Sequence, residues 1–314
     1  MNPVAPADIE SAHTRICPFI RRTPLVELPR GSLLAGHDVS LKLEFLQRGG
    51  SFKPRGAFNS LLSQTVPAAG VAAASGGNHG VAVALAARDR GVPATIFVPD
   101  IASPAKIAVI RAAGADIRIG GARYNDALEA CTRFVAATGA LSVHAYDTPE
   151  TIAGQGTVAL EWERQWGAPL DTVLVAVGGG GLIAGMAAWW QKRVKVIGVE
   201  PAGSRALHAA LAAGKPVDVD VNSVAADSLG ARRVGDLAFA IAREAVDHVV
   251  LVDDAAITAA QRDLWSTFRI ASEPGGAAAM AALISATYRP APDERVGVLL
   301  CGANVELGKL AGSI

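Results

Sequence analysis

Short apolar runs alternate along the chain with longer alanine-rich segments whose apolar residues recur at helical spacing. The short runs predict strands at residues 94–98, 141–144, 172–177, 194–200, 248–252 and 295–301. The longer segments predict helices at residues 104–113, 125–138, 152–166, 182–191, 254–268 and 275–287. Strands and helices that alternate in this way predict an α/β fold, in which helices cover mainly parallel sheets.

The 314 residues are enough for one large domain or two modest ones. For two domains we place a small inserted domain at residues 70–146 and build a large one from residues 1–69 and 147–314. The segment after Ser204 reads as irregular because it contains Gly214, Pro216 and Gly230. Ligands of open α/β sheets bind at the carboxyl ends of strands, so the glycine-rich turns after predicted strands are the candidate sites.

The balance of charge argues against nucleic acid or an acidic membrane as a partner, because both Lys plus Arg and Asp plus Glu number 29. No apolar stretch approaches the roughly 18 residues that span a bilayer, and the N-terminus lacks the apolar core of a signal peptide. The three cysteines are too few and too scattered for a disulfide framework or a zinc site. We therefore expect a cytoplasmic protein.

Residues 50–57 read GSFKPRGA and contain the first candidate for chemistry. Lys53 has Phe52 as its neighbour and glycines on both sides. A lysine that forms a Schiff base needs an apolar neighbour that lowers its pKa and a tight backbone that a cofactor can approach. Lys53 is therefore a candidate Schiff-base lysine, and the alternative is an ordinary solvated lysine in a surface loop.

Residues 75–80 read SGGNHG and precede an alanine-rich helical pattern. They predict a turn that opens a helix, with Ser75 as a candidate cap. Backbone N–H groups around Gly76 and Gly77 can bind a carboxylate or phosphate, and the Asn78 amide can donate to a phenolate or carboxylate oxygen. The alternative is a plain capping turn, with a structural role for His79.

Four glycines, Gly178, Gly179, Gly180 and Gly181, stand with Leu182 between a predicted buried strand and a predicted helix. A glycine run in this context predicts a backbone nest that wraps a phosphate at the start of a helix. The run lacks the Lys-Ser/Thr ending of a P-loop and the register of a dinucleotide fingerprint. A phosphate outside a nucleotide is therefore favoured over a flexible connector.

Cys301 ends the last predicted strand, where its thiol could bond a ring nitrogen or simply fill the core. Glu200 and Glu273 also stand at strand or loop ends, and each is either a cation ligand or a solvated carboxylate.

These stretches together resemble the fold-type-II pyridoxal-phosphate enzymes, which include serine and threonine dehydratases and serine racemase. The motifs that match in order and spacing are TPL at 23–25, KLE at 42–44, SFK at 51–53, SGGNH at 75–79, IAGQGT at 152–157, GGGGL at 178–182, GVEP at 198–201 and CGAN at 301–304. The resemblance implies two open, twisted, mainly parallel sheets flanked by helices, as in the tryptophan synthase beta chain. It also implies a homodimer.

The resemblance assigns the cofactor, pyridoxal 5'-phosphate, to Lys53, with Phe52 against the pyridine ring. It implies that residues 178–182 hold the cofactor phosphate, that Asn78 bonds the phenolic oxygen and that Cys301 meets the ring nitrogen. A thiol cannot keep that nitrogen protonated as a carboxylate does, so the ring is a weaker electron sink and loss of a β-leaving group is favoured.

The resemblance further implies that residues 75–79 hold the substrate carboxylate. Cys301, together with residues 223–230, is similar to the serine dehydratase branch. The expected reaction is elimination of water from L-serine or L-threonine, giving pyruvate or 2-oxobutyrate and ammonia. Racemases of the family carry a proton-donating serine where this chain has Gly76, which argues against racemisation unless Ser228 or a water substitutes.

The same residues are also compatible with other functions. An amino-acid racemase and a β-replacement enzyme use the same cofactor residues, and so would a non-enzymatic carrier of the cofactor. A nicotinamide-dependent oxidoreductase would need a fingerprint that the glycine run lacks. At the racemases' divalent-cation site Glu200 matches but Ala206 replaces a carboxylate, so a monovalent cation suits Glu200 better than Mg²⁺. Tyr146, before the IAGQGT motif, is a candidate for shaping the side-chain pocket.

Overall fold

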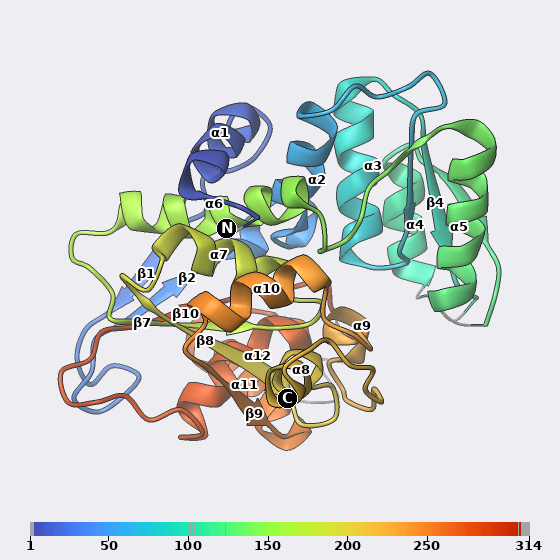
Figure 1. Cartoon of the computed structure of the whole chain (residues 1–314). Coiled ribbons are helices and arrows are strands. Elements are labelled where there is room, and N and C mark those ends of the chain that lie inside the picture. Colours follow the sequence, from blue (N-terminus) through green and yellow to red (C-terminus); the bar gives the residue numbers. More distant parts are fainter. Residues whose placement is uncertain (1–2, 101, 103, 123, 307, 309–314) are drawn as a thin grey trace.

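The computed structural model describes residues 3–100, 102, 104–122, 124–306 and 308. Their strands form two sheets, as Figure 1 shows. The larger has the order β1-β2-β10-β7-β8-β9, and the smaller has the order β5-β4-β3-β6. Within these sheets β1 and β2 are antiparallel and the other paired strands run parallel. The expectation of an α/β fold with two mainly parallel sheets is confirmed.

The strands of the large sheet are β1 (Leu25–Leu28), β2 (Val39–Lys42), β7 (Thr172–Ala176), β8 (Lys195–Pro201), β9 (His248–Val252) and β10 (Val296–Leu299). The strands of the small sheet are β3 (Val71–Ala74), β4 (Ala94–Val98), β5 (Asp116–Ile119) and β6 (Leu141–Ser142). The predicted strands at 94–98 and 248–252 have the observed bounds, and the other predicted strands overlap β6, β7, β8 and β10.

The α-helices are α1 (Pro6–Ile16), α2 (Lys53–Leu62), α3 (Asn78–Arg90), α4 (Pro104–Ala112), α5 (Tyr124–Thr138), α6 (Pro149–Gln165), α7 (Gly181–Trp190), α8 (Ala206–Ala213), α9 (Ala226–Leu229), α10 (Asp236–Ala245), α11 (Asp254–Phe268) and α12 (Pro274–Ile284). Two 3-10 helices, η1 (Glu44–Leu46) and η2 (Arg48–Gly50), precede α2. The expectation of irregular structure after Ser204 is wrong in part, because α8 and α10 lie there. None of the described helices is long and apolar enough to cross a membrane.

The large sheet is the centre of the main hydrophobic core. Helices α6 and α7 lie on one side of it, and α12, backed by α11, packs on the other (Figure 1). Strand β7 is buried along its whole length, as the continuous apolar run VLVAV predicts. Trp162 of α6 and Trp190 of α7 are fully buried and pack together, with ring centroids 6.3 Å apart.

The small sheet is covered on both faces by alanine-rich helices (Figure 1). Along β3, Val71 and Ala73 pack in the cluster that contains α3, whereas Ala72 and Ala74 pack in the cluster that contains α5. This alternation follows from the two-residue repeat of a strand. Helix α2 contacts both α6 and α3 and therefore lies between the two sheets. The first residue of that helix is Lys53.

Candidate active site

Lys53 begins α2 at the junction of the two sheets. Its side chain is half-buried, and the amine donates a 2.8 Å hydrogen bond to the carbonyl oxygen of Ala145. The amine also lies 5.2 Å from the centroid of the Phe52 ring. Burial lowers the pKa of Lys53 to about 8, although nearby Cys301 and Glu273 favour the charged form. An amine with this pKa is partly neutral near physiological pH, as a nucleophile or base must be.

The chain that follows β10 runs beside the start of α2 and brings Cys301 to the site. Ser51 and Gly302 form an antiparallel bridge, and the Phe52 N–H donates to the carbonyl oxygen of Cys301 over 3.1 Å. The Cys301 thiol is buried and lies 3.7 Å from the carbonyl oxygen of Gly275. Burial raises the pKa of this thiol to about 12, so it stays protonated and neutral at pH 7.

Asn78, the first residue of α3, is held on both sides of its amide. Its Nδ2 donates to Oε1 of Glu273 over 2.7 Å, and its Oδ1 accepts from Nδ2 of Asn304 over 2.8 Å. Asn304 Nδ2 also donates to the carbonyl oxygen of Gly49. These contacts fix the orientation of the Asn78 amide and leave one of its two Nδ2 hydrogens for a ligand.

Glu273 is buried and occupies the N-cap position of α12, where its side chain makes no capping hydrogen bond. Burial raises its pKa to about 7, and the Asn78 hydrogen bond and the charge of Lys106 offset only part of this. Its second oxygen, Oε2, is buried and has no partner among the described residues. An unpartnered buried carboxyl oxygen is unfavourable, which is typical of a site built for a ligand or for a proton.

Residues 75–77 lead from β3 into α3, which begins at Asn78, so the predicted turn that opens a helix is confirmed. The cap of α3 is Gly77 rather than Ser75, whose hydroxyl instead accepts from the Gly77 N–H over 3.2 Å. The ring of His79 is buried, and its Nε2 lies 2.8 Å from the carbonyl oxygen of Val143. Burial and the charge of Lys53 lower the pKa of His79 to about 3, so the ring is neutral and positions the loop.

The glycine run lies between β7 and α7, in the predicted strand–turn–helix context. Gly180 has a φ of 92°, in the left-handed region that favours glycine. A Cβ atom on Gly179 would overlap the ring of Tyr146, and one on Gly181 would overlap that residue's backbone. Asp147, which follows Tyr146 in the chain, accepts hydrogen bonds from the first backbone N–H groups of α10. The segment at 143–147 is therefore fixed against both Lys53 and the glycine run.

Glu200 is fully buried near the end of β8. Its two carboxylate oxygens each accept a 2.8 Å hydrogen bond, from the backbone N–H groups of Leu207 and His208. Burial nevertheless raises the pKa of Glu200 to about 7. Among the residues that the structure describes, no cluster of three or more His, Cys, Asp or Glu side chains could hold a metal ion.

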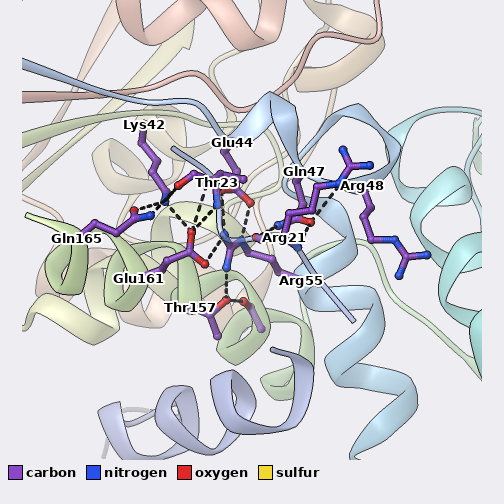
Figure 2. Close-up of polar contacts among 11 residues, drawn as sticks. Arg21, Thr23, Lys42, Glu44, Gln47, Arg48, Arg55, Thr157, Glu161 and Gln165 are labelled. Carbon is purple, nitrogen blue, oxygen red and sulfur yellow. Dashed lines mark hydrogen bonds and ion pairs between the residues drawn. The ribbon is translucent and has the colours of Figure 1, made fainter. Parts of the chain in front are cut away.

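A buried network of charges supports the helix that begins at Lys53 (Figure 2). Arg55 donates to Glu44 through Nε over 2.5 Å and pairs with Glu161 through Nη2 at 3.1 Å. Glu161 also accepts from Lys42 over 2.7 Å and from the Thr23 N–H over 2.9 Å. Burial disfavours the charge on Arg55, but the two carboxylates outweigh it and raise its pKa. Two cations thus balance two anions in the core.

The family model described as "Pyridoxal-phosphate dependent enzyme" matches residues 16–302. The chain belongs to this family. It is 37% identical to phenylserine dehydratase from Ralstonia pickettii, with 96% of this chain and 94% of that protein covered.

Two solved structures extend the comparison. Maize serine racemase superposes with a TM-score of 0.92 at 34% identity, covering 99% of this chain and 96% of that chain. Threonine deaminase from T.th. superposes with a TM-score of 0.90 at 34% identity, covering 96% of this chain and 99% of that chain. The relatives of this pyridoxal-phosphate dependent enzyme therefore include dehydratases as well as racemases.

The residues of this family member fit its cofactor, pyridoxal 5'-phosphate. Lys53 offers an amine of lowered pKa, and residues 178–181 form a side-chain-free turn at the start of α7. Buried oxygen atoms of Ser51 and Glu273 have no partner among the described residues. A phosphate needs N–H donors at a helix start, and an aldehyde needs a neutral amine, so both ends of the cofactor find matching groups.

The sequence alone did not assign three groups that the structure places at this site. The sequence allowed Glu273 to be either a cation ligand or a solvated carboxylate. In the structure it is buried and accepts a hydrogen bond from Asn78. Asn304 had no assigned role although it stands in the CGAN motif. The Ala145 carbonyl carries no side-chain signal at all. To predict these contacts, the sequence would have to show which distant residues meet, such as Asn78 and Glu273, which are 195 positions apart.

Proposed function

We propose that this pyridoxal-phosphate dependent enzyme is a dehydratase (ammonia-lyase) that removes water from a β-hydroxy-α-amino acid. L-Serine and L-threonine are the proposed substrates, and the products are pyruvate or 2-oxobutyrate with ammonia. The observation that carries the proposal is the environment of Gly76. A Cβ atom there would lie 2.7 Å from the Ala102 Cβ and 2.9 Å from Val98 Cγ1, so apolar groups fill the place of a proton-donating side chain.

In this proposal Lys53 would bond the cofactor, Phe52 would lie beside its ring and residues 178–182 would hold its phosphate. The Asn78 amide, fixed by Glu273 and Asn304, donates its remaining hydrogen to the phenolic oxygen. The ring of pyridoxal phosphate withdraws electrons from the substrate Cα and so weakens the Cα–H bond. The backbone of residues 75–79, at the start of α3, binds the substrate carboxylate.

Lys53 is proposed to move the proton at Cα. When it is not bonded to the cofactor, its amine would be partly neutral near physiological pH because of its lowered pKa, and the neutral form can accept that proton. The Ala145 carbonyl, which holds the amine at 2.8 Å, orients it. The electron pair of the Cα–H bond would form the Cα–Cβ double bond, and the β-hydroxyl would leave as water with the proton that Lys53 took from Cα. Hydrolysis of the released enamine gives the 2-oxo acid and ammonia.

Cys301 supports elimination over transamination. Its pKa of about 12 means that it would meet the ring nitrogen as a neutral thiol rather than as an anion. A neutral partner does not hold a proton on the ring nitrogen, so charge at Cα is stabilised weakly. A substrate that expels a β-hydroxyl removes that charge immediately, whereas a substrate without a leaving group does not.

A racemase is the alternative, and the similarity to serine racemases gives it a specific basis. The deciding experiment incubates the cofactor-loaded enzyme with L-serine, L-threonine and their D-forms. Released 2-oxo acid is assayed by coupled reduction, and the enantiomers are separated by chiral chromatography. We expect 2-oxo acid from the L-forms without accumulation of the opposite enantiomer. Enantiomer formation without 2-oxo acid would make the enzyme a racemase, and visible absorbance with neither product would point to β-replacement or to a carrier.

The substrate side chain is proposed to meet Tyr146. Its ring is half-buried against Gly179 and lies edge-on to His144, with centroids 4.7 Å apart. The likeness to phenylserine dehydratase makes an aromatic β-substituent worth testing. We expect Tyr146→Ala to change the relative kcat/KM for serine, threonine, 3-hydroxyaspartate and phenylserine by tenfold or more. Equal ratios in both proteins would remove Tyr146 from the substrate pocket.

Two further features stay predictions. A monovalent cation held by Glu200 and backbone carbonyls is expected to raise the rate when K⁺ replaces a tetraalkylammonium salt. A homodimer is expected from light scattering coupled to size exclusion.

A further inference from the structure

A cavity of about 200 Å³ lies beside the C-terminal ends of α1 and α6. Its lining residues are His13, Cys17, Ile20, Arg22, Glu161 and Arg164. None of them belongs to the groups assigned to the cofactor or to the amino-acid substrate. The cavity is therefore separate from the active site.

The charges around this cavity do not balance. Glu161 is the one carboxylate among the described lining residues, and it is already neutralised by Lys42 and Arg55 (Figure 2). Arg22 and Arg164 are exposed, and neither makes a hydrogen bond or ion pair with another described residue. The C-terminal ends of the two helices contribute partial negative charge, which two full guanidinium charges outweigh.

His13 is a second, independent indication that the cavity binds a ligand. Its Nδ1 atom is buried and has no hydrogen bond among the described residues. The charged groups around it are Arg164 and Glu161 of α6 and Arg55 of α2, and burial together with the arginines lowers its pKa. A neutral imidazole with a free ring nitrogen can donate one hydrogen bond to a ligand.

We propose that this cavity binds a small molecule through an oxyanion group, a phosphoryl or a carboxylate, held by Arg22 and Arg164 with His13 as a further donor. Guanidinium groups bind both kinds of oxyanion through paired N–H donors, and each paired contact is stronger than a neutral hydrogen bond. Ile20 and Cys17 complete the lining of the cavity.

The cavity also has a physical connection to the active site. Glu161 forms part of its wall and pairs with Arg55 at 3.1 Å, and Arg55 is two residues after Lys53 in α2. The cavity is thus joined by one ion pair to the helix that begins at Lys53.

The test uses the cofactor-loaded enzyme, in which the glycine run is occupied and cannot bind the probe. Sulfate, as a phosphoryl analogue, and malonate, as a carboxylate, are titrated separately by isothermal calorimetry at constant ionic strength. We expect saturable binding of one probe, which identifies the oxyanion class, and a loss of tenfold or more in affinity in Arg22→Ala and in Arg164→Ala. The matched control is Arg90→Ala, an exposed arginine at the end of α3.

Cys17 gives a second measurement that does not depend on the arginine variants. It is exposed at the cavity, whereas Cys131 and Cys301 are buried. We expect the binding probe to slow N-ethylmaleimide labelling of Cys17 at least fivefold. Absence of saturable binding by both probes, or equal affinity in the wild type and both arginine variants, would overturn the proposal. Unprotected Cys17 would overturn it as well.

Discussion

The amine of Lys53 donates a 2.8 Å hydrogen bond to the carbonyl oxygen of Ala145, 92 residues further along the chain. Ala145 belongs to the segment that also places Tyr146 against Gly179 and Asp147 at the start of α10. The position of the lysine is therefore tied to the glycine run through one connecting segment.

Lys53→Ala should abolish turnover and the visible absorbance of the bound cofactor, with a fold unchanged by circular dichroism. In the wild-type apoprotein, the rate of covalent cofactor addition should rise about tenfold per pH unit and level off above about pH 8, because the reactive neutral amine forms as Lys53 loses its proton. Stopped-flow absorbance measures this rate. N-α-Acetyl-lysine is the reference amine, and its rate should still be rising at pH 9. A plateau shared by both amines would show that the cofactor rather than Lys53 sets the profile.

Glu273→Gln should make the apoprotein relatively more stable at high pH. Because burial raises the pKa of Glu273 to about 7, the folded state binds more protons than the unfolded state between about pH 4.5 and 7. Wild-type stability attributable to this group is present at low pH and lost as pH rises through 7, by on the order of 3 kcal/mol. Urea unfolding at pH 5 and 8 measures the difference. Glu129→Gln on the surface is the control, and identical pH dependence in wild type and Glu273→Gln would contradict the assignment.

Arg55→Met should destabilise the protein by about 3–5 kcal/mol, since it leaves the buried carboxylates of Glu44 and Glu161 short of a cation. The comparison is Arg133→Ala, which breaks an exposed 3.7 Å pair with Glu129 and should cost less than about 1 kcal/mol. Both are measured by urea unfolding. Equal effects of the two substitutions would mean that water reaches the buried network.

Gly179→Ala should weaken cofactor affinity at least tenfold, because the added Cβ would overlap the Tyr146 ring beside the phosphate turn. Tyr146→Ala in the same chain should restore part of the loss by removing that ring. Equilibrium dialysis with absorbance detection gives the dissociation constants. Gly167→Ala is the matched control, as a Cβ atom there meets nothing within 4 Å. A loss that Tyr146→Ala leaves unchanged would place the cause in the backbone instead.

Local pattern predicted some elements with their observed bounds and missed others for a physical reason. Helix α11 was expected at 254–268 and is found there, with Asp253 accepting from the Ala256 N–H as its cap. Strand β3 was missed because its sequence, VAAA, has one β-branched residue and three alanines. Pairing with β4 and β6 makes it a strand, and no local signal reports that pairing.

The sequence by itself determined the groups whose chemistry is local: the lysine beside a phenylalanine, the glycine run between strand and helix, and the SGGNH turn. Their residue types and spacing are sufficient, because backbone freedom and helix starts are properties of neighbouring residues. Only the tertiary structure decided that Glu273 and Asn304 fix Asn78, that Ala145 holds Lys53 and that an arginine-lined cavity adjoins the buried network. These contacts join residues far apart in the chain, and the pKa of Lys53 depends on burial that exists only once both sheets pack around α2.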